Sequence, residues 1–294
     1  MARYPPDLDR WRRAARIASE ARELGASLAV PGASRREIAD RIEARIRELG
    51  AEPAFPANLS RNVEAAHYTP SPDDEATLVD GDVLKVDVGA HLDGAISDTA
   101  KTVEVGGGRR HERLIRASRD ALAAGIERVR PGGAINDISV AIERAIRSLG
   151  FRPVENLMGH SIERYLLHAG VSIPNVSGMS DGHLEEGQII AIEPFATNGV
   201  GQIENGPFGH IVRFRADPGT GDAEVAQLYD RVRTLPFTAR YLDADGQATL
   251  VRTKRKLQSY PVFVEAGGGL VSQAEHTVLV TATGAEVLTA PVAP

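Results

Sequence analysis

The sequence predicts an α+β fold made of two similar halves, with a helical segment inserted into the second half. Three observations favour this fold. Amphipathic helix patterns precede strand patterns, one of the helix patterns recurs one hundred residues later, and residues 197–271 carry further helix-like stretches before the last strands.

Two helices are predicted at the start of the chain, over residues 7–25 and 34–49. Ser34 followed by Glu37 is a capping-box pattern that marks the start of the second helix. Apolar side chains recur along one face of that helix at Ile38, Ile42, Ile46 and Leu49.

Residues 84–105 predict two strands joined by the turn dipeptide Asp93-Gly94. A two-residue turn pairs Asp87 with Ala100, so Asp98 is a diagonal neighbour of Asp87 on the same face. A register shifted by one residue in each strand would instead place the two Asp directly opposite. Either way their side chains lie roughly 5–8 Å apart, and burial would require a cation between them. Taken alone, this stretch is read slightly more readily as an exposed hairpin with solvated carboxylates.

The helix pattern at 34–49 recurs at 134–149, together with the Pro and Gly residues that flank it. Pro31-Gly32 matches Pro131-Gly132, and Pro53 matches Pro153. Helical periodicity alone explains the apolar matches but not the matching Pro and Gly residues on either side of the helix. We therefore interpret the pattern as an internal duplication. Extending the alignment gives three further pairs of counterparts: Asp87 with Glu193, Asp98 with Glu275, and His67 with His168.

Four carboxylates from four strands exceed the needs of one divalent ion. With two ions about 3.5–4 Å apart, Asp98 and Glu275 could bridge while Asp87 and Glu193 bind terminally. His160 is the leading nitrogen ligand. The chain has no cysteine, and such an oxygen and imidazole set suits Mn²⁺, Fe²⁺, Co²⁺ or Zn²⁺. A bridging water would then supply a hydroxide nucleophile near neutral pH.

Composition excludes several classes of protein. The 294 residues are 42% apolar and 25% charged with a net charge of −6, which is ordinary for a globular protein and gives no argument for nucleic-acid or membrane binding. No apolar run approaches the roughly 20 residues that span a bilayer. We therefore expect a cytoplasmic protein.

Residues 197–271 are predicted to form an inserted helical subdomain, with helices over 223–233 and 247–257. The remaining residues, 1–196 and 272–294, would form the catalytic domain.

Five spaced motifs resemble the type 2 methionine aminopeptidases of archaeal form, which have the pita-bread fold. The motifs are HYTP at 67–70, KVDVGAHLDGAISDTA at 85–100, GHSIERYLLHAGVSIPN at 159–175, IEPFAT at 192–197 and EHT at 275–277. The insertion after IEPFAT, with TLPF at 234–237, favours type 2 over type 1.

The resemblance implies removal of the initiator methionine from nascent chains whose second residue is small. It implies that Asp87, Asp98, His160, Glu193 and Glu275 bind two divalent metals (Co, Mn, Fe or Zn), with Glu193 shuttling a proton. His67 and His168 would contact the scissile amide and the oxyanion, and the methionine pocket would be lined by Phe55, His67, Leu167, His168 and Tyr260. A monomer is implied, and contact with the ribosome is a further expectation. Ala274 stands where the family usually has an aromatic residue, which bears on the shape of the pocket wall.

Three alternatives remain open. A Xaa-Pro dipeptidase shares the fold and ligand set, although such enzymes usually carry an N-terminal domain before the first metal-binding Asp. A non-catalytic pita-bread protein would bind RNA or protein partners, but such relatives have degraded ligands, and all five are present here. A purely structural metal site is the weakest reading, and it predicts unfolding on chelation.

Overall fold

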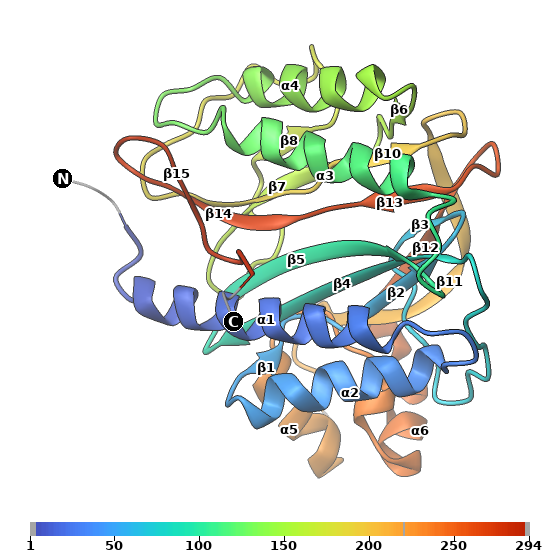
Figure 1. Cartoon of the computed structure of the whole chain (residues 1–294). Helices are drawn as coiled ribbons and strands as arrows, with labels where there is room; N and C mark the ends of the chain where they lie inside the picture. The colour runs from blue at the N-terminus through green and yellow to red at the C-terminus, as the bar shows by residue number, and fades with distance from the viewer. Residues whose placement is uncertain (1–3, 220, 292–294) are drawn as a thin grey trace.

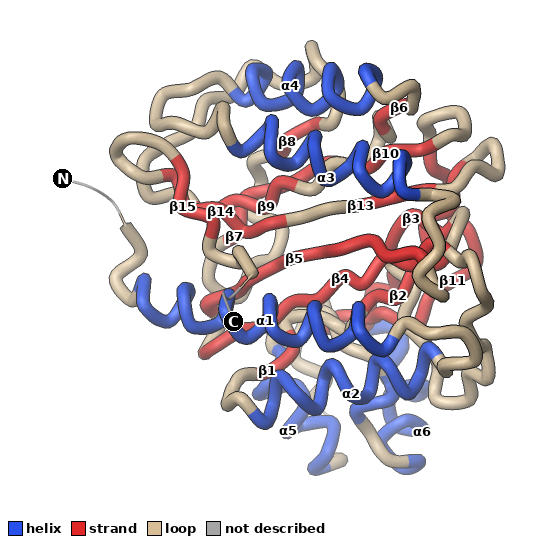
Figure 2. Tube along the Cα trace, viewed as in Figure 1, coloured by secondary structure: helices blue, strands red, loops and turns tan. Residues whose placement is uncertain are grey.

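A computed structural model describes residues 4–219 and 221–291. Figure 1 shows strands in the middle of the molecule, with α1 and α2 covering one side and α3 and α4 the other. Figure 2 shows the same arrangement by secondary structure, with helices outside and strands inside. The mixed architecture agrees with the predicted α+β class. In the described part of the chain, no helix has the length and apolar character needed to cross a membrane.

The helices fall into the two covering layers and the segment predicted as an insertion. They are α1 (Leu8–Leu28), α2 (Arg35–Glu48), α3 (Glu112–Ile126), α4 (Ile135–Ser148), α5 (Ala223–Val232) and α6 (Ala244–Arg252), with the short 3₁₀ helices η1 (Ala239–Tyr241) and η2 (Lys254–Lys256).

The strands of the first half and their neighbours are β1 (Glu52–Pro53), β2 (Asn58–Arg61), β3 (Glu64–Ala66), β4 (Val83–Leu92), β5 (Ala95–Glu104), β6 (Arg152–Pro153), β7 (Met158–Ile162) and β8 (Ser172–Pro174). Those that follow are β9 (Ile189–Ile192), β10 (Phe195–Thr197), β11 (Ile203–Phe214), β12 (Leu257–Glu265), β13 (Val271–Gln273), β14 (His276–Val280) and β15 (Ala285–Val287).

The two predicted N-terminal helices are confirmed as α1 and α2. The Ser34 side chain accepts a hydrogen bond from the Glu37 backbone N–H at 3.4 Å, as the capping box requires. Ile38, Ile42 and Ile46 are buried on the face of α2 that packs against the strands.

The predicted hairpin is confirmed as β4 and β5, with Asp87 paired to Ala100. Both turn residues have positive φ, 49° at Asp93 and 82° at Gly94, as a type I′ turn requires. The shifted register, with the two Asp directly opposite, is wrong for this hairpin because Asp98 faces Gly89.

The internal repeat is visible in the hydrogen bonds as well as in the helices. The Gly32 N–H donates to the Leu78 carbonyl at 2.7 Å, and the Gly132 N–H donates to the Leu184 carbonyl at 2.8 Å. The helices that follow, α2 and α4, begin and end one hundred residues apart. Both halves therefore use the same loop to start the same helix.

The two halves meet along β5 and β14, which lie side by side in Figure 1. The Asp98 N–H donates to Thr277 Oγ1 at 2.7 Å, and the Glu275 N–H donates to the Ala100 carbonyl at 3.0 Å. This seam brings Asp98 of one half beside Glu275 of the other.

The segment predicted as a helical insertion is only partly helical. The helix predicted over 223–233 is confirmed as α5. The helix predicted over 247–257 is displaced, since α6 ends at Arg252 and Leu257 already begins β12. The long strands β11 and β12 were missed; they pair with each other, and β12 also pairs with β3. Division into the ranges 1–196 with 272–294 and 197–271 stays a prediction, and residues 1–3, 220 and 292–294 of those ranges lie outside the described chain.

Candidate metal centre

The first half supplies two carboxylates from its hairpin. Asp87 lies in the middle of β4, where β2 pairs Asn58 opposite it, and Asn58 Nδ2 donates to Asp87 Oδ2 at 3.3 Å. Asp98 lies on β5 at the diagonal position. Both side chains are buried and line one cavity of about 180 Å³.

The second half supplies two glutamates from strands that are far apart in the sequence. Glu193 directly follows β9 and Glu275 directly precedes β14. The surrounding register pairs Ile192 with His276 and Phe195 with Gln273, so Glu193 and Glu275 stand opposite each other. Gln273 Nε2 lies 3.4 Å from an oxygen of each glutamate.

His160 reaches this cluster from β7. Its Nε2 lies 3.7 Å from Asp98 Oδ2 and 3.6 Å from Glu193 Oε1, while its Nδ1 faces the Ser161 carbonyl at 3.3 Å. A carbonyl at Nδ1 holds the proton there and leaves Nε2 free to bind a cation. One ligand atom each from Asp98, His160 and Glu275 lie within 4.8 Å of one another.

The electrostatics of this cluster are unfavourable for the protein alone. Burial raises the pKa of Asp87 to about 7. Burial, followed by repulsion from the neighbouring carboxylates, raises the pKa values of Asp98, Glu193 and Glu275 well above their ordinary values. Burial lowers the pKa of His160 to about 3. These four acids would all be ionised near neutral pH only if a positive charge were bound among them.

The unpaired atoms fit the same requirement. In the described chain, Asp87 Oδ1 and Asp98 Oδ1 are buried without a hydrogen-bond partner. Buried polar atoms are ordinarily satisfied, so these oxygens indicate a missing ligand. Carboxylate oxygens with one imidazole and no thiolate form a set suited to divalent metals, and the residues present therefore fit such ions.

The two histidines predicted to contact the substrate, His67 and His168, line the same cavity. His67 adopts a left-handed φ of 65°, and its ring packs 5.7 Å from that of Tyr260 and 4.4 Å from that of Phe263, centroid to centroid. The His168 ring lies 4.3 Å from that of His160. Burial lowers the pKa of His67 to about 4, and burial followed by the charge of Arg213 lowers the pKa of His168, so both are neutral at ordinary pH.

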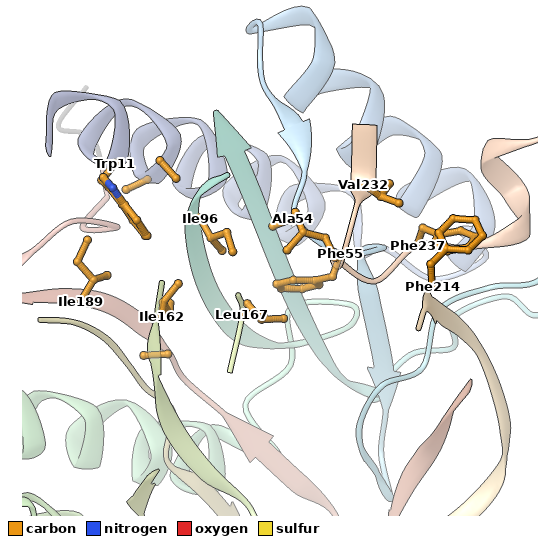
Figure 3. Close-up of a cluster of buried hydrophobic side chains, with 14 of the residues drawn as sticks. Trp11, Ala54, Phe55, Ile96, Ile162, Leu167, Ile189, Phe214, Val232 and Phe237 are labelled. Carbon is orange, nitrogen blue, oxygen red and sulfur yellow. The ribbon is translucent and has the colours of Figure 1, made fainter. Parts of the chain in front are cut away.

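The apolar part of the cavity contains the three predicted pocket residues Phe55, Leu167 and Tyr260. Figure 3 shows Phe55 and Leu167 in the middle of a buried cluster, between Trp11 on one side and Phe237 on the other. All ten predicted site residues thus line one cavity: Phe55, His67, Asp87, Asp98, His160, Leu167, His168, Glu193, Tyr260 and Glu275.

Sequence reasoning missed several neighbours of the site. Asn58 and Gln273 donate to the acids, and Ile211 and Pro236 bring the segment 197–271 to the cavity wall. Gln273 could have been found, because it lies two residues before Glu275 and shares its strand face.

Ala274, where the family usually has an aromatic residue, lies away from the cavity. This residue is not among the described residues that line the cavity; it packs in the core beneath α3 and α4 and borders a separate groove. Strand neighbours alternate in direction, so Ala274 points away from the face of Glu275.

Known proteins resemble this chain in two ways: some share its sequence, and others share only its fold. The model of metallopeptidase family M24 matches residues 9–282. The methionine aminopeptidase of Pyrococcus abyssi is 46% identical over 286 residues, which cover 93% of this chain and 96% of that protein. Among solved structures, a thermophilic Arx1 has a TM-score of 0.82 at 18% identity, covering 98% of this chain and 91% of that one. The prolidase of Pyrococcus furiosus has a TM-score of 0.65 at 18% identity, covering 99% of this chain and 66% of that one. At these identities the two structures show only the pita-bread fold, whereas the sequence relative bears on activity.

Proposed function

Since this chain belongs to metallopeptidase family M24, we propose that it is a methionine aminopeptidase, which hydrolyses the peptide bond after an N-terminal methionine. The observation that carries the proposal is the single cavity in which the buried acids and His160 adjoin an apolar pocket. The apolar pocket adjoins the acid cluster, so a methionine side chain held there would place its own peptide bond beside the acids, which suits an exopeptidase.

We propose that two divalent ions bind here and that five residues would hold them: Asp87, Asp98, His160, Glu193 and Glu275. When bound, such ions supply a Lewis acid and lower the pKa of water towards neutrality. The donor set admits Co, Mn, Fe or Zn.

The protein's own groups then perform the proton and charge chemistry. Glu193 borders the cavity, so its carboxylate can take a proton from the attacking water and pass it to the leaving amine. His168 is neutral and borders the cavity, so its N–H can donate to the oxygen that develops negative charge. His67 lines the same cavity and would orient the scissile amide.

Substrate selection follows from the pocket. Phe55, Leu167 and Tyr260, with His67 and His168, would hold the methionine side chain by shape, since one methylene in such a slot is worth roughly 1–3 kcal/mol. Substrates would be nascent chains with a small second residue, met in the cytoplasm by a monomer that contacts the ribosome.

The test is release of free methionine from Met-Gly-Met-Met by metal-stripped protein, before and after addition of Mn²⁺ or Co²⁺. Metal-dependent release that is lost in Glu193→Gln and greatly reduced in His168→Ala supports the proposal. Hydrolysis of Xaa-Pro dipeptides with no release of methionine would establish the dipeptidase instead. No hydrolysis of either by folded, metal-loaded protein would favour a binding protein.

A further inference from the structure

Arg240 is a buried cation outside the cavity that the proposed chemistry does not use. It lies on η1, between α5 and α6, and in Figure 1 these helices lie on the same side of the strands as α2. Its side chain is 4% exposed, and Glu43 of α2, with which it pairs, is 3% exposed. A buried pair of this kind is costly unless its remaining hydrogen bonds are satisfied.

All five N–H groups of the Arg240 guanidinium have partners. Nη1 donates to Asp40 Oδ1 at 2.5 Å and to Glu43 Oε2 at 2.9 Å. Nη2 donates to Glu43 Oε1 at 2.7 Å and to Thr69 Oγ1 at 3.2 Å, and Nε donates to the Pro70 carbonyl at 3.0 Å. The side chain thereby joins η1 to α2 and to the loop after β3.

The partners of Arg240 hold a third segment. Glu43 Oε1 also accepts the Ala57 N–H at 3.0 Å, and Thr69 Oγ1 donates to the Ala57 carbonyl at 3.0 Å. Both backbone polar groups of Ala57 are therefore fixed by residues that Arg240 contacts. The Leu59 N–H donates to the Tyr68 carbonyl at 2.7 Å, which keeps the two segments side by side.

Both segments contribute residues to the cavity wall. Phe55 lies two residues before Ala57, Asn58 directly follows Ala57, and His67 lies two residues before Thr69. The left-handed φ of His67 is a conformation that persists only when its surroundings fix it. Small shifts at Ala57 and Thr69 would therefore displace Phe55 and His67.

We infer that Arg240 is a positioning residue for the substrate pocket: it sets the spacing of Phe55 and His67 by clamping Ala57 and Thr69 from behind. The inference rests on the proposed function for the nature of the substrate, but the clamp itself does not. An Arg is required because its planar fork makes five bonds in fixed directions, whereas a Lys ammonium would keep the charge and lose the fork.

The test compares Arg240→Lys and Arg240→Met with Arg116→Met, which removes an exposed ion pair to Asp120 on α3. A displacement of about 1 Å can cost about 10²-fold in rate, so kcat/KM for Met-Gly-Met-Met should fall by about 10²-fold in Arg240→Met and less in Arg240→Lys. The ratio of Met-peptide to Leu-peptide hydrolysis, measured at saturating Mn²⁺, should fall as well. Arg116→Met should match the wild type.

Amide hydrogen exchange gives a readout independent of hydrolysis. Exchange at residues 55–60 and 67–70 should accelerate in Arg240→Met, while exchange in α4 stays unchanged. If Arg240→Met does not fold, the double variant Arg240→Met with Glu43→Gln replaces it in the experiment, because that variant leaves no buried Glu43 carboxylate without its partner. A variant with a lower melting temperature but wild-type kcat, KM, selectivity and exchange in these segments would overturn the inference. If the wild type releases no methionine, the proposed function fails and the exchange data alone decide whether the clamp exists.

Discussion

The two halves of the molecule reach one cavity by different local routes. In the first half the acids come from one continuous hairpin and stand diagonally, with Asp98 facing Gly89. In the second half Glu193 and Glu275 stand directly opposite each other, on strands separated by β11, β12 and the helices between them. A duplicated framework thus fixes which positions carry acids, while local register decides how each pair is presented.

The hydrogen-bond support of the two acid pairs also differs. Asn58 donates to Asp87 in the first half, whereas in the second half Gln273 lies within 3.4 Å of both Glu193 and Glu275. Across the seam, backbone bonds hold Asp98 beside Glu275. Among substitutions of these residues, we therefore expect those at Asp98 and Glu275 to lower activity most and those at Asn58 and Gln273 to lower it least.

The largest effect is expected from the seam pair. Asp98→Asn and Glu275→Gln each remove an oxygen ligand that would be shared between ions. Loss of one oxyanion donor costs about 10²–10³-fold in rate. Methionine release should fall by more than this in each variant. Assays at saturating Mn²⁺ check this. Activity retained in either variant would show that the seam does not hold the reacting group.

The next effect separates the two related histidines. His168→Ala should lower kcat by about 10²–10³-fold, because it removes a donor to the developing charge. His67→Ala should act mainly on KM, because the His67 ring packs against Tyr260 and Phe263. Steady-state kinetics on the same peptide decide between them, and a dominant kcat effect at His67 would reverse the assignment.

The pocket residues should give a smaller effect that is selective for substrate. Leu167→Ala enlarges the slot and should lower kcat/KM for Met peptides by about 10- to 200-fold, with metal content unchanged. Val251→Ala, on the exposed face of α6, is the matched control and should have no effect. Equal losses on Met and Leu peptides would argue against a pocket at Leu167.

The supporting amides should tune metal affinity. Asn58→Ala and Gln273→Ala each remove a donor behind the acids, and metal affinity should weaken by about 10- to 100-fold. Gln273→Ala should have the larger effect because Gln273 lies near two acids. Calorimetric titration with Mn²⁺ measures this, and unchanged affinity in both variants would leave the amides with a packing role only.

The smallest effect concerns protons. In the metal-free protein the pKa of Asp87 is about 7, so its carboxyl group is largely protonated at pH 6 and ionised at pH 8. A metal binds only the ionised carboxylates, and the pKa values of Asp98, Glu193 and Glu275 are raised as well. Affinity should therefore rise as pH increases from 6 to 8, and protons should be released on binding. Titrations in buffers of different ionisation enthalpy detect this release. Affinity that falls with rising pH would contradict the account.

Much of the site was predictable because its signals are local or duplicated. The turn dipeptide Asp93-Gly94 set the register of β4 and β5, and the repeat mapped Asp87 and Asp98 onto Glu193 and Glu275. The Ser34 cap and the spaced Ile residues marked α2.

The rest depends on contacts that sequence spacing does not encode. The strands β11 and β12 were missed because their pairing partners lie far apart in the chain and their sequences lack clean alternation. Asn58 was missed because its role follows from lying opposite Asp87 across β2 and β4. The contacts of Arg240 with Glu43 and Thr69 likewise arise only when α2, the β3 loop and η1 pack together.

The proposed function requires that the two halves together hold one dinuclear centre. The most direct test is the number of Mn²⁺ ions bound per chain, measured by equilibrium dialysis and elemental analysis of the wild type, Asp87→Asn and Glu193→Gln. We expect two ions in the wild type and fewer in each variant, whichever half carries the change. One ion in the wild type, lost in only one of the two variants, would contradict it.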